Sequence, residues 1–266
     1  MVRTISTSKM KTFFLLLIAL LASVILFKTD ASAGTADNTY YNTGILTYNE
    51  ETRATLWPKG TVIVMTPTDD KMYIGTEAEN LIINGTVKTI AIPGVGSSSI
   101  GAAAFAKHIA DIRNEYVAGI TVGYGDASIY TEGTQGYFIG RSSNIAGTYY
   151  YEPASAKLAD LYARGARPSL LVGHSKGDMD VANALYKMYN EGHQSWYQGV
   201  RVVTFGCGVY VPAGVGTFNQ YLGNLDTLGT SNTVSYRNLT WVYGRYHTTN
   251  PFYWATYMPI DWYLEP

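Results

Sequence analysis

The sequence predicts an α/β fold: a mostly parallel central sheet with helices on both faces. From residue 87 to 206, apolar β-branched runs alternate with stretches of helical periodicity, and this alternation is typical of parallel strands joined by crossover helices. In the same region a Gly-flanked turn, Gly173-His174-Ser175-Lys176-Gly177, follows the apolar run Leu170–Val172 and precedes an amphipathic stretch. The 266 residues suffice for one large domain with a substantial core.

Strands and helices are expected in the following order. Residues 34–60 are polar and predict an irregular extension, and residues 71–83 predict short strands separated by turns at Gly75 and Asn84-Gly85. Longer strands are predicted at 61–66, 87–92, 117–122, 170–172, 200–205 and 233–242, and helices at 99–116, 153–164 and 178–189.

The turn around Ser175 fits the pattern G-x-S-x-G. Between a strand and a helix, this pattern predicts a sharp turn that presents the serine hydroxyl at the end of the sheet. Such a turn strains the backbone, and glycines on both sides avoid clashes with the neighbouring elements. By itself the pattern is short enough to arise by chance in a loop. The prediction therefore rests on the strand expected before it and the helix expected after it.

The stretch Val172-Gly-His-Ser-Lys-Gly177 resembles the nucleophile elbow of the α/β-hydrolases, especially the class-three (fungal-type) lipases. A related bacterial group of lipase-like hydrolases shares G-H-S-K-G, whereas Asp178 stands here where a second glycine is usual. The resemblance covers roughly residues 87–250, and Val202–Gly206 also resembles the strand after the elbow helix. It implies the α/β-hydrolase fold and a serine nucleophile.

An oxyanion hole requires two backbone N–H groups aimed at one point. One donor is expected to be the N–H of Lys176. The other is expected from the turn Pro93-Gly94-Val95-Gly96-Ser97, because this superfamily places its second donor after an earlier strand. Gly94, Val95 and Gly96 all remain candidates, and Val95 is the first choice.

A serine nucleophile needs a base, and the base needs a group that orients it. In this superfamily the chain order is Ser, acid, His, which selects His247 as the base and Asp226 as the acid. Asp226 could instead be a turn residue, with Asn238 orienting the histidine. The side chains of Lys176, Asp178 and Asp180, in the first turn of the elbow helix, are expected to face solvent.

Within a predicted insertion at 126–151, residues 128–151 are rich in Gly, Ser, Thr and Tyr and show no helical period. The resemblance implies that such an insertion helps to form a lid or an acyl pocket. The alternative, equally open, is a surface excursion packed by its own tyrosines.

The N-terminus predicts a secretory signal peptide at 1–33. A basic start precedes an apolar run at 13–27, and Ala31-Ser32-Ala33 follows as a cleavage site. The run is shorter than the ~20 residues of a membrane span, so cleavage is favoured over an anchor. A single domain at 34–266 would then be extracellular, or located in the periplasm or at the cell surface. Cys207 is the one cysteine and is expected to be a buried residue, not a nucleophile.

The sequence therefore predicts a secreted serine hydrolase, lipase- or esterase-like, with Ser175, Asp226 and His247 as its triad and no metal or organic cofactor. An ester or lipid is the expected substrate. The net charge of −1 does not favour nucleic acid, and the aromatic tail at 251–266 either packs on the core or contacts a lipid surface transiently. Other acyl hydrolases (polyester depolymerase, thioesterase, peptidase) and a non-catalytic binding protein remain alternatives.

Overall fold

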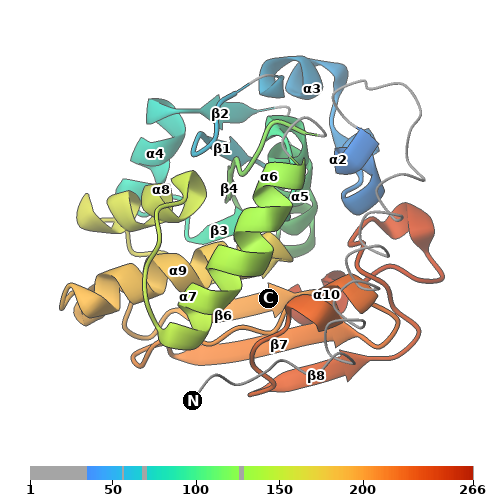
Figure 1. Cartoon of the computed structure of the whole chain (residues 1–266). Coiled ribbons are helices and arrows are strands. Elements are labelled where there is room, and N and C mark those ends of the chain that lie inside the picture. Colours follow the sequence, from blue (N-terminus) through green and yellow to red (C-terminus); the bar gives the residue numbers. More distant parts are fainter. Residues whose placement is uncertain (1–34, 56, 68–70, 126–128, 266) are drawn as a thin grey trace. The chain divides into compact units, whose positions relative to one another are not determined.

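Eight strands form one sheet in the part of the chain that the computed structural model describes, residues 35–55, 57–67, 71–125 and 129–265 (Figure 1). Their order is β2-β1-β4-β3-β5-β6-β7-β8. Strand β1 runs antiparallel to both of its neighbours, and the pairs from β4 to β8 are all parallel. The strands are β1 Val62–Met65, β2 Met72–Ile74, β3 Thr89–Ile92, β4 Val117–Ile120, β5 Leu170–His174, β6 Arg201–Phe205, β7 Thr217–Gly223 and β8 Leu239–Val242.

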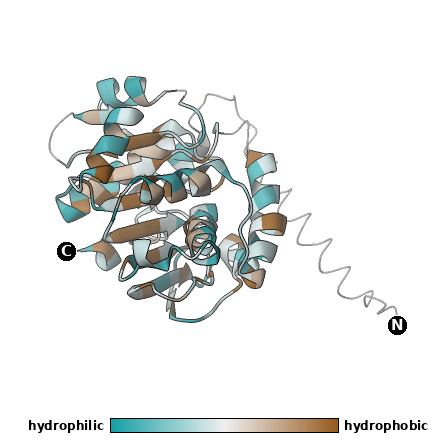
Figure 2. Cartoon of the chain, turned by 90° about the vertical axis from the view of Figure 1, so that its left-hand side faces the viewer, coloured by the Kyte–Doolittle hydropathy of each residue, from teal (hydrophilic) through white to brown (hydrophobic). Residues whose placement is uncertain are grey.

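Helices cover both faces of the sheet, as predicted. Alternate residues of one strand enter opposite cores because strand side chains point to opposite faces: Ile90 packs with α4, α8 and α9, whereas Ala91 packs with α5 and α11. Figure 2 shows the hydrophobic residues concentrated on the strands between these layers. The longer of these helices are α4 Thr76–Ile83, α5 Ser99–Arg113, α8 Pro153–Ala163 and α9 Lys176–Asn190, and the shorter is α11 Asp261–Leu264.

The prediction of an irregular extension at 34–60 was wrong, because helices α2 (Thr35–Tyr40) and α3 (Tyr48–Ala54) lie there, with the 3₁₀ turn η1 (Thr43–Ile45) between them. Helix α3 starts with a capping box: the Thr47 hydroxyl accepts from Glu50 N–H at 3.3 Å, and the Glu50 carboxylate accepts from Thr47 N–H at 2.8 Å. This pairing satisfies two backbone donors that would otherwise lack partners. Residues 71–83 likewise form one strand, β2, and helix α4 rather than several strands.

One strand was missed. Strand β7 carries the polar residues Asn219 and Gln220 and is only partly buried, so it lacks an apolar pattern. The strand predicted at 233–242 is shorter than expected, because only its last four residues form a strand, β8. Helix α10 (Thr227–Asn232) lies between β7 and β8 in the chain. The remaining short turns are η3 (Gln194–Trp196) and η4 (Pro251–Tyr253).

The segment predicted to lack helical structure at 128–151 is helical over most of its described length. Helix α6 (Ile129–Thr134), the π-helical η2 (Gln135–Gly140) and α7 (Arg141–Ala146) follow one another as one rod (Figure 1). Glycine disfavours helix formation, so the glycines in this segment prevent the prediction of a helix from the sequence. Tertiary packing compensates, because a methyl group on Gly140 would lie only 2.8 Å from the Tyr150 hydroxyl and 3.1 Å from the Met179 sulfur.

The predicted signal peptide and residues 126–128 of the predicted insertion lie outside the described residues. Of the helices that the structure does describe, none has the length and hydrophobicity to cross a bilayer.

Gly177 and Gly133 provide a matched pair for testing close packing at the elbow. A methyl group on Gly177 would overlap the backbone carbonyl oxygens of Ile92 and Pro93, whereas one on Gly133 would meet only the Val95 side chain at 3.9 Å. Gly177→Ala should lower the free energy of unfolding by about 3 kcal/mol, and Gly133→Ala should raise it by about 0.5 kcal/mol. Urea unfolding measures both, and equal effects would contradict the close packing.

Candidate active site

Ser175 lies in a strained turn between β5 and α9. Its backbone has φ 57° and ψ −120°, a conformation that costs free energy in any residue other than glycine. Gly173 and Gly177 make the turn sterically feasible, since a side chain on Gly173 would meet Asp178 and one on Gly177 would meet the end of β3. The turn places Ser175 at the carboxyl end of the sheet, 5% exposed, next to the N-terminus of α9.

The residues predicted as acid and base lie together with Ser175. His247 Nε2 is 2.7 Å from Ser175 Oγ, and His247 Nδ1 is 2.7 Å from Asp226 Oδ2. Asp226 follows β7 and His247 follows β8. Because parallel strands bring their carboxyl ends to one edge, loops separated by many residues meet at the serine.

Asp226 makes contacts that fit both interpretations of the sequence, an acid beside the histidine and a turn residue. Its Oδ2 faces His247, and its Oδ1 accepts the N–H of Gly229 at 2.6 Å as the cap of α10. The side chain is buried, so the cap fixes which oxygen is presented to the imidazole. Asn238, the alternative, lies instead in a left-handed turn (φ 55°) and donates to the carbonyl of Phe218 at 3.1 Å.

The turn after β3 lies against the serine, since a methyl group on Gly94 would be 3.0 Å from Ser175 Cβ. Gly94 N–H donates to the Tyr41 hydroxyl at 2.6 Å, and Gly96 N–H donates to the Glu132 carboxylate at 3.1 Å. Among the described residues the N–H groups of Val95 and Lys176 form no hydrogen bond. Of the three candidates in the turn, Val95 is therefore the one with a free donor.

Glu132 links this turn to the helical rod. Its carboxylate is fully buried and forms an ion pair with Lys59 at 2.7 Å, while it accepts the N–H of Gly96. The carboxylate occupies space left by Gly123, where a side chain would collide with it. The predicted insertion is thus anchored directly to the turn beside Ser175.

The prediction that Lys176 and Asp180 face solvent was wrong. Lys176 Nζ is buried and lies 2.9 Å from Asp180 and 3.2 Å from Glu152, the N-cap of α8. Burial, then the charge of Glu152, raises the pKa of Asp180 to about 7 despite the opposing charge of Lys176. A buried charge must be paired. Asp180 lies one turn along the same helix, but Glu152 precedes α8, so the sequence around Lys176 does not reveal this second partner.

Asp178 is also buried rather than exposed. Its Oδ1 accepts the N–H of Phe205, the last residue of β6, at 3.3 Å. Burial raises the pKa of this carboxyl well above its usual range, although backbone N–H groups oppose the rise. Asp178 therefore fastens the elbow helix to the neighbouring strand.

Two further side chains that can titrate, Cys207 and His193, lie outside this arrangement. Cys207 is buried, as predicted, and burial raises the pKa of its thiol. His193 stacks on Trp196 with ring centroids 3.9 Å apart. Within the described ranges no group of three His, Cys, Asp or Glu residues is arranged to hold a metal ion.

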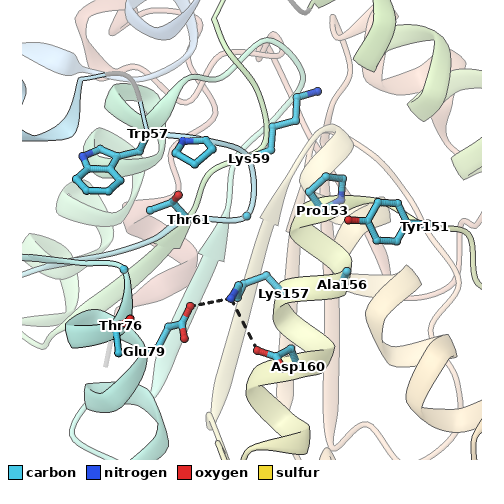
Figure 3. A pocket seen from close by; sticks show the side chains of 13 residues that line it. Trp57, Lys59, Thr61, Thr76, Glu79, Tyr151, Pro153, Ala156, Lys157 and Asp160 are labelled. Carbon is cyan, nitrogen blue, oxygen red and sulfur yellow. Dashed lines mark hydrogen bonds and ion pairs between the residues drawn. The ribbon is translucent and has the colours of Figure 1, made fainter.

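A surface pocket of about 510 Å³ lies between the segment before β1 and helices α4 and α8 (Figure 3). Lys157 at its wall pairs with Glu79 at 2.7 Å and with Asp160 at 3.8 Å. Ser175, Asp226 and His247 are not among the residues that line it.

Comparison with known proteins gives only distant similarity. Neither a protein-family model nor a curated protein matches the chain. The similar solved structures include the following three. A dienelactone hydrolase-like promiscuous phosphotriesterase from metagenomic libraries has 17% identity and a TM-score of 0.40, over 62% of this chain and 73% of its own. A bacterial heroin esterase has 14% identity and a TM-score of 0.40, over 85% and 88%. An esterase structure from the fungus Rhizomucor miehei has 12% identity and a TM-score of 0.43, over 91% and 92%.

Similarities this weak say nothing about substrate. The fold follows from the molecule itself: a mostly parallel eight-stranded sheet within the described residues, with helices on both faces and a strained serine turn after β5. This is the α/β-hydrolase fold.

The variant Lys176→Met tests how much the buried cluster of Lys176, Asp180 and Glu152 contributes to stability. Lys176→Met leaves Asp180 and Glu152 without their cation and should lower the free energy of unfolding by about 3–5 kcal/mol near pH 8. The deficit should shrink toward about pH 5, because a carboxyl whose folded pKa is raised becomes less destabilising once it binds a proton. Chemical denaturation at both pH values measures this.

Lys187→Met is the matched control. Lys187 pairs with Glu191 across one turn of the same helix, but this pair is partly exposed, so its loss should change stability by less than about 0.5 kcal/mol. A Lys176→Met variant as stable as this control would show that the cluster contributes nothing.

Proposed function

We propose that the protein is a serine hydrolase that cleaves carboxylic esters through an acyl-enzyme intermediate. One observation supports this most strongly: two hydrogen-bond distances of 2.7 Å connect Ser175 to His247 and His247 to Asp226. Nucleophile, base and orienting acid in this order constitute a triad. Two free N–H groups beside the serine supply the remaining requirement, a site for the oxyanion.

In the proposed acylation step, Ser175 Oγ attacks the ester carbonyl carbon while His247 Nε2 takes the hydroxyl proton. Asp226 holds the proton on Nδ1, so that Nε2 is free to accept, and it stabilises the imidazolium that forms. The N–H groups of Val95 and Lys176 donate to the negative oxygen of the tetrahedral intermediate. His247 then gives its proton to the leaving alcohol as the C–O bond breaks.

Deacylation repeats these roles with water. His247 accepts a proton from the water molecule as its oxygen attacks the acyl carbon, and returns a proton to Ser175 Oγ when the serine leaves. The α9 dipole adds to the stabilisation of negative charge, because its N-terminus begins at Lys176. No metal or organic cofactor takes part in the proposed cycle.

The finer assignment rests on the resemblance of the elbow to those of class-three lipases. We propose a lipase- or esterase-like substrate range, with residues 129–151 contributing to the acyl pocket, and secretion directed by residues 1–33. The contact of Glu132 with the turn at Gly96 supports a role of this segment in the site. Thioesters, polyesters and peptides could react through the same triad.

A fluorophosphonate probe tests the nucleophile without knowledge of the substrate. The wild type should be labelled, Ser175→Ala should not be labelled, and His247→Ala should react about 1,000-fold more slowly, because the hydroxyl loses its base. Gel fluorescence and intact mass measure labelling. A folded wild type that stays unlabelled, also in detergent, would favour a non-catalytic binding protein on this fold.

The orienting acid is tested by Asp226→Asn, which retains an oxygen for the Gly229 cap but loses the charge beside His247. The turnover number on a p-nitrophenyl ester should fall by about 1,000-fold or more. Asn238→Gly, which keeps the left-handed turn, should stay close to wild type. The reverse ranking would transfer the orienting role to Asn238.

A further inference from the structure

Two buried rings connect the turn at Gly94 to the backbone of His247. Tyr41 follows α2 and is 2% exposed, and His174 ends β5 and is 1% exposed. The Tyr41 hydroxyl lies 2.6 Å from Gly94 N and 2.7 Å from His174 Nδ1, and His174 Nε2 lies 2.7 Å from the carbonyl oxygen of His247. Neither ring belongs to the triad.

The partners determine where the protons are. The carbonyl of His247 can only accept, so Nε2 of His174 carries its hydrogen. A neutral His174 then accepts at Nδ1, and the Tyr41 hydroxyl donates to it. The same hydroxyl oxygen accepts from Gly94 N–H. All the donors therefore point one way, from Gly94 through Tyr41 and His174 to His247, an arrangement in which each bond strengthens the next.

A neutral His174 also suits the chemistry at its neighbour. The rings of His174 and His247 are 5.0 Å apart, and the other rings around His174 are those of Tyr40, Tyr41 and Phe105. Burial in this setting, and then the charge of His247, lowers the pKa of His174 to about 3. A second cation here would oppose the imidazolium that His247 becomes during the reaction.

The loop after His247 holds Tyr41 from the other side. Thr248 Oγ1 donates to the carbonyl of Thr39 at 2.7 Å, Thr249 Oγ1 to that of Tyr40 at 2.9 Å, and Asn250 Nδ2 to that of Tyr41 at 3.2 Å. The hydrogen bonds thus form a closed ring: the base loop holds the segment at 39–41, Tyr41 holds the turn and His174, and His174 holds the base loop.

We infer that Tyr41 and His174 are positioning residues that set the distance between the oxyanion turn and the general base. This inference rests on the proposed function. Tyr41 occupies the N–H of Gly94, which leaves the N–H of Val95 to face the oxyanion, and His174 fixes the backbone from which the His247 ring extends. Misplacement of either part by a fraction of an ångström would affect the transition state more than substrate binding.

The kinetic test uses Tyr41→Phe, which removes one hydroxyl and keeps the ring. With p-nitrophenyl butyrate, kcat should fall about 10- to 50-fold while KM changes less than about twofold. The control is Tyr162→Phe on α8. The Tyr162 hydroxyl is buried and has no hydrogen-bond partner among the residues that the structure describes, so this variant should keep the wild-type kcat.

His174 variants separate the hydrogen bonds from the packing. The amide of His174→Gln can still donate to the His247 carbonyl, whereas His174→Leu cannot. We expect the Gln variant to recover at least about tenfold in kcat over the Leu variant. Equal losses in two folded variants would indicate a packing role and would overturn the inference.

An NMR measurement on ¹⁵N-histidine-labelled protein tests the network without using activity. His174 should remain neutral with hydrogen on Nε2 from about pH 5 to about pH 9, and Tyr41→Phe should shift the Nδ1 resonance. Hydrogen on Nδ1, or titration within this range, would overturn the inference.

The two proposals fail differently. A wild type that the fluorophosphonate probe labels, together with a Tyr41→Phe kcat equal to wild type, would refute the positioning role and leave the hydrolase intact. A wild type that is never labelled would refute the hydrolase and the positioning role with it.

Discussion

The strained turn at Ser175 determines where the other parts of the site lie. It begins where β5 ends and α9 starts, and its backbone conformation is one that only close packing can maintain. Ser175 N–H donates to the carbonyl of Phe205 at 2.8 Å, and Asp178 accepts the Phe205 N–H. The end of β6 therefore holds the turn on both sides, and the glycine at 177 lets the end of β3 approach it.

Buried ion pairs also hold the segments on which the two candidate oxyanion donors lie. The backbone N–H of Lys176 lies next to Ser175 and forms no hydrogen bond within the described part of the chain, while the Lys176 side chain pairs with Glu152 and Asp180. Glu132 acts in the same way at the turn after β3, where it accepts from Gly96 N–H and pairs with Lys59. Both candidate oxyanion donors are thus adjacent to a buried ion pair, whose rigidity limits the movement of the donors.

The parts of this arrangement that could be predicted are those that depend on local chemistry. The G-x-S-x-G turn is visible because two glycines and a serine must occupy adjacent positions, and the order of acid and base selects Asp226 and His247 from few candidates. The choice among Gly94, Val95 and Gly96 required the structure. Only the partners Tyr41 and Glu132, distant in sequence, identify which N–H groups are already occupied.

The secondary-structure predictions that were wrong failed because tertiary contacts decide the structure at those positions. Strand β7 pairs on both edges although Asn219 and Gln220 interrupt its apolar residues. The rod at 129–146 is helical although it contains three glycines, at 133, 136 and 140, and a fourth follows directly at 147. In both cases tertiary contacts outweigh the local preference. The capping box at Thr47 and Glu50 was a local signal for a helix in the N-terminal region that the polar composition obscured.

The contacts between residues 39–41 and the loop at 247–250 have a consequence for folding. They join segments about two hundred residues apart in a chain of 266, and contacts of such long sequence separation form slowly because the intervening loop must first be closed. On a ribosome the first of these segments emerges long before its partner is synthesised. We therefore expect the site around Ser175 to be among the last parts of the molecule to become complete.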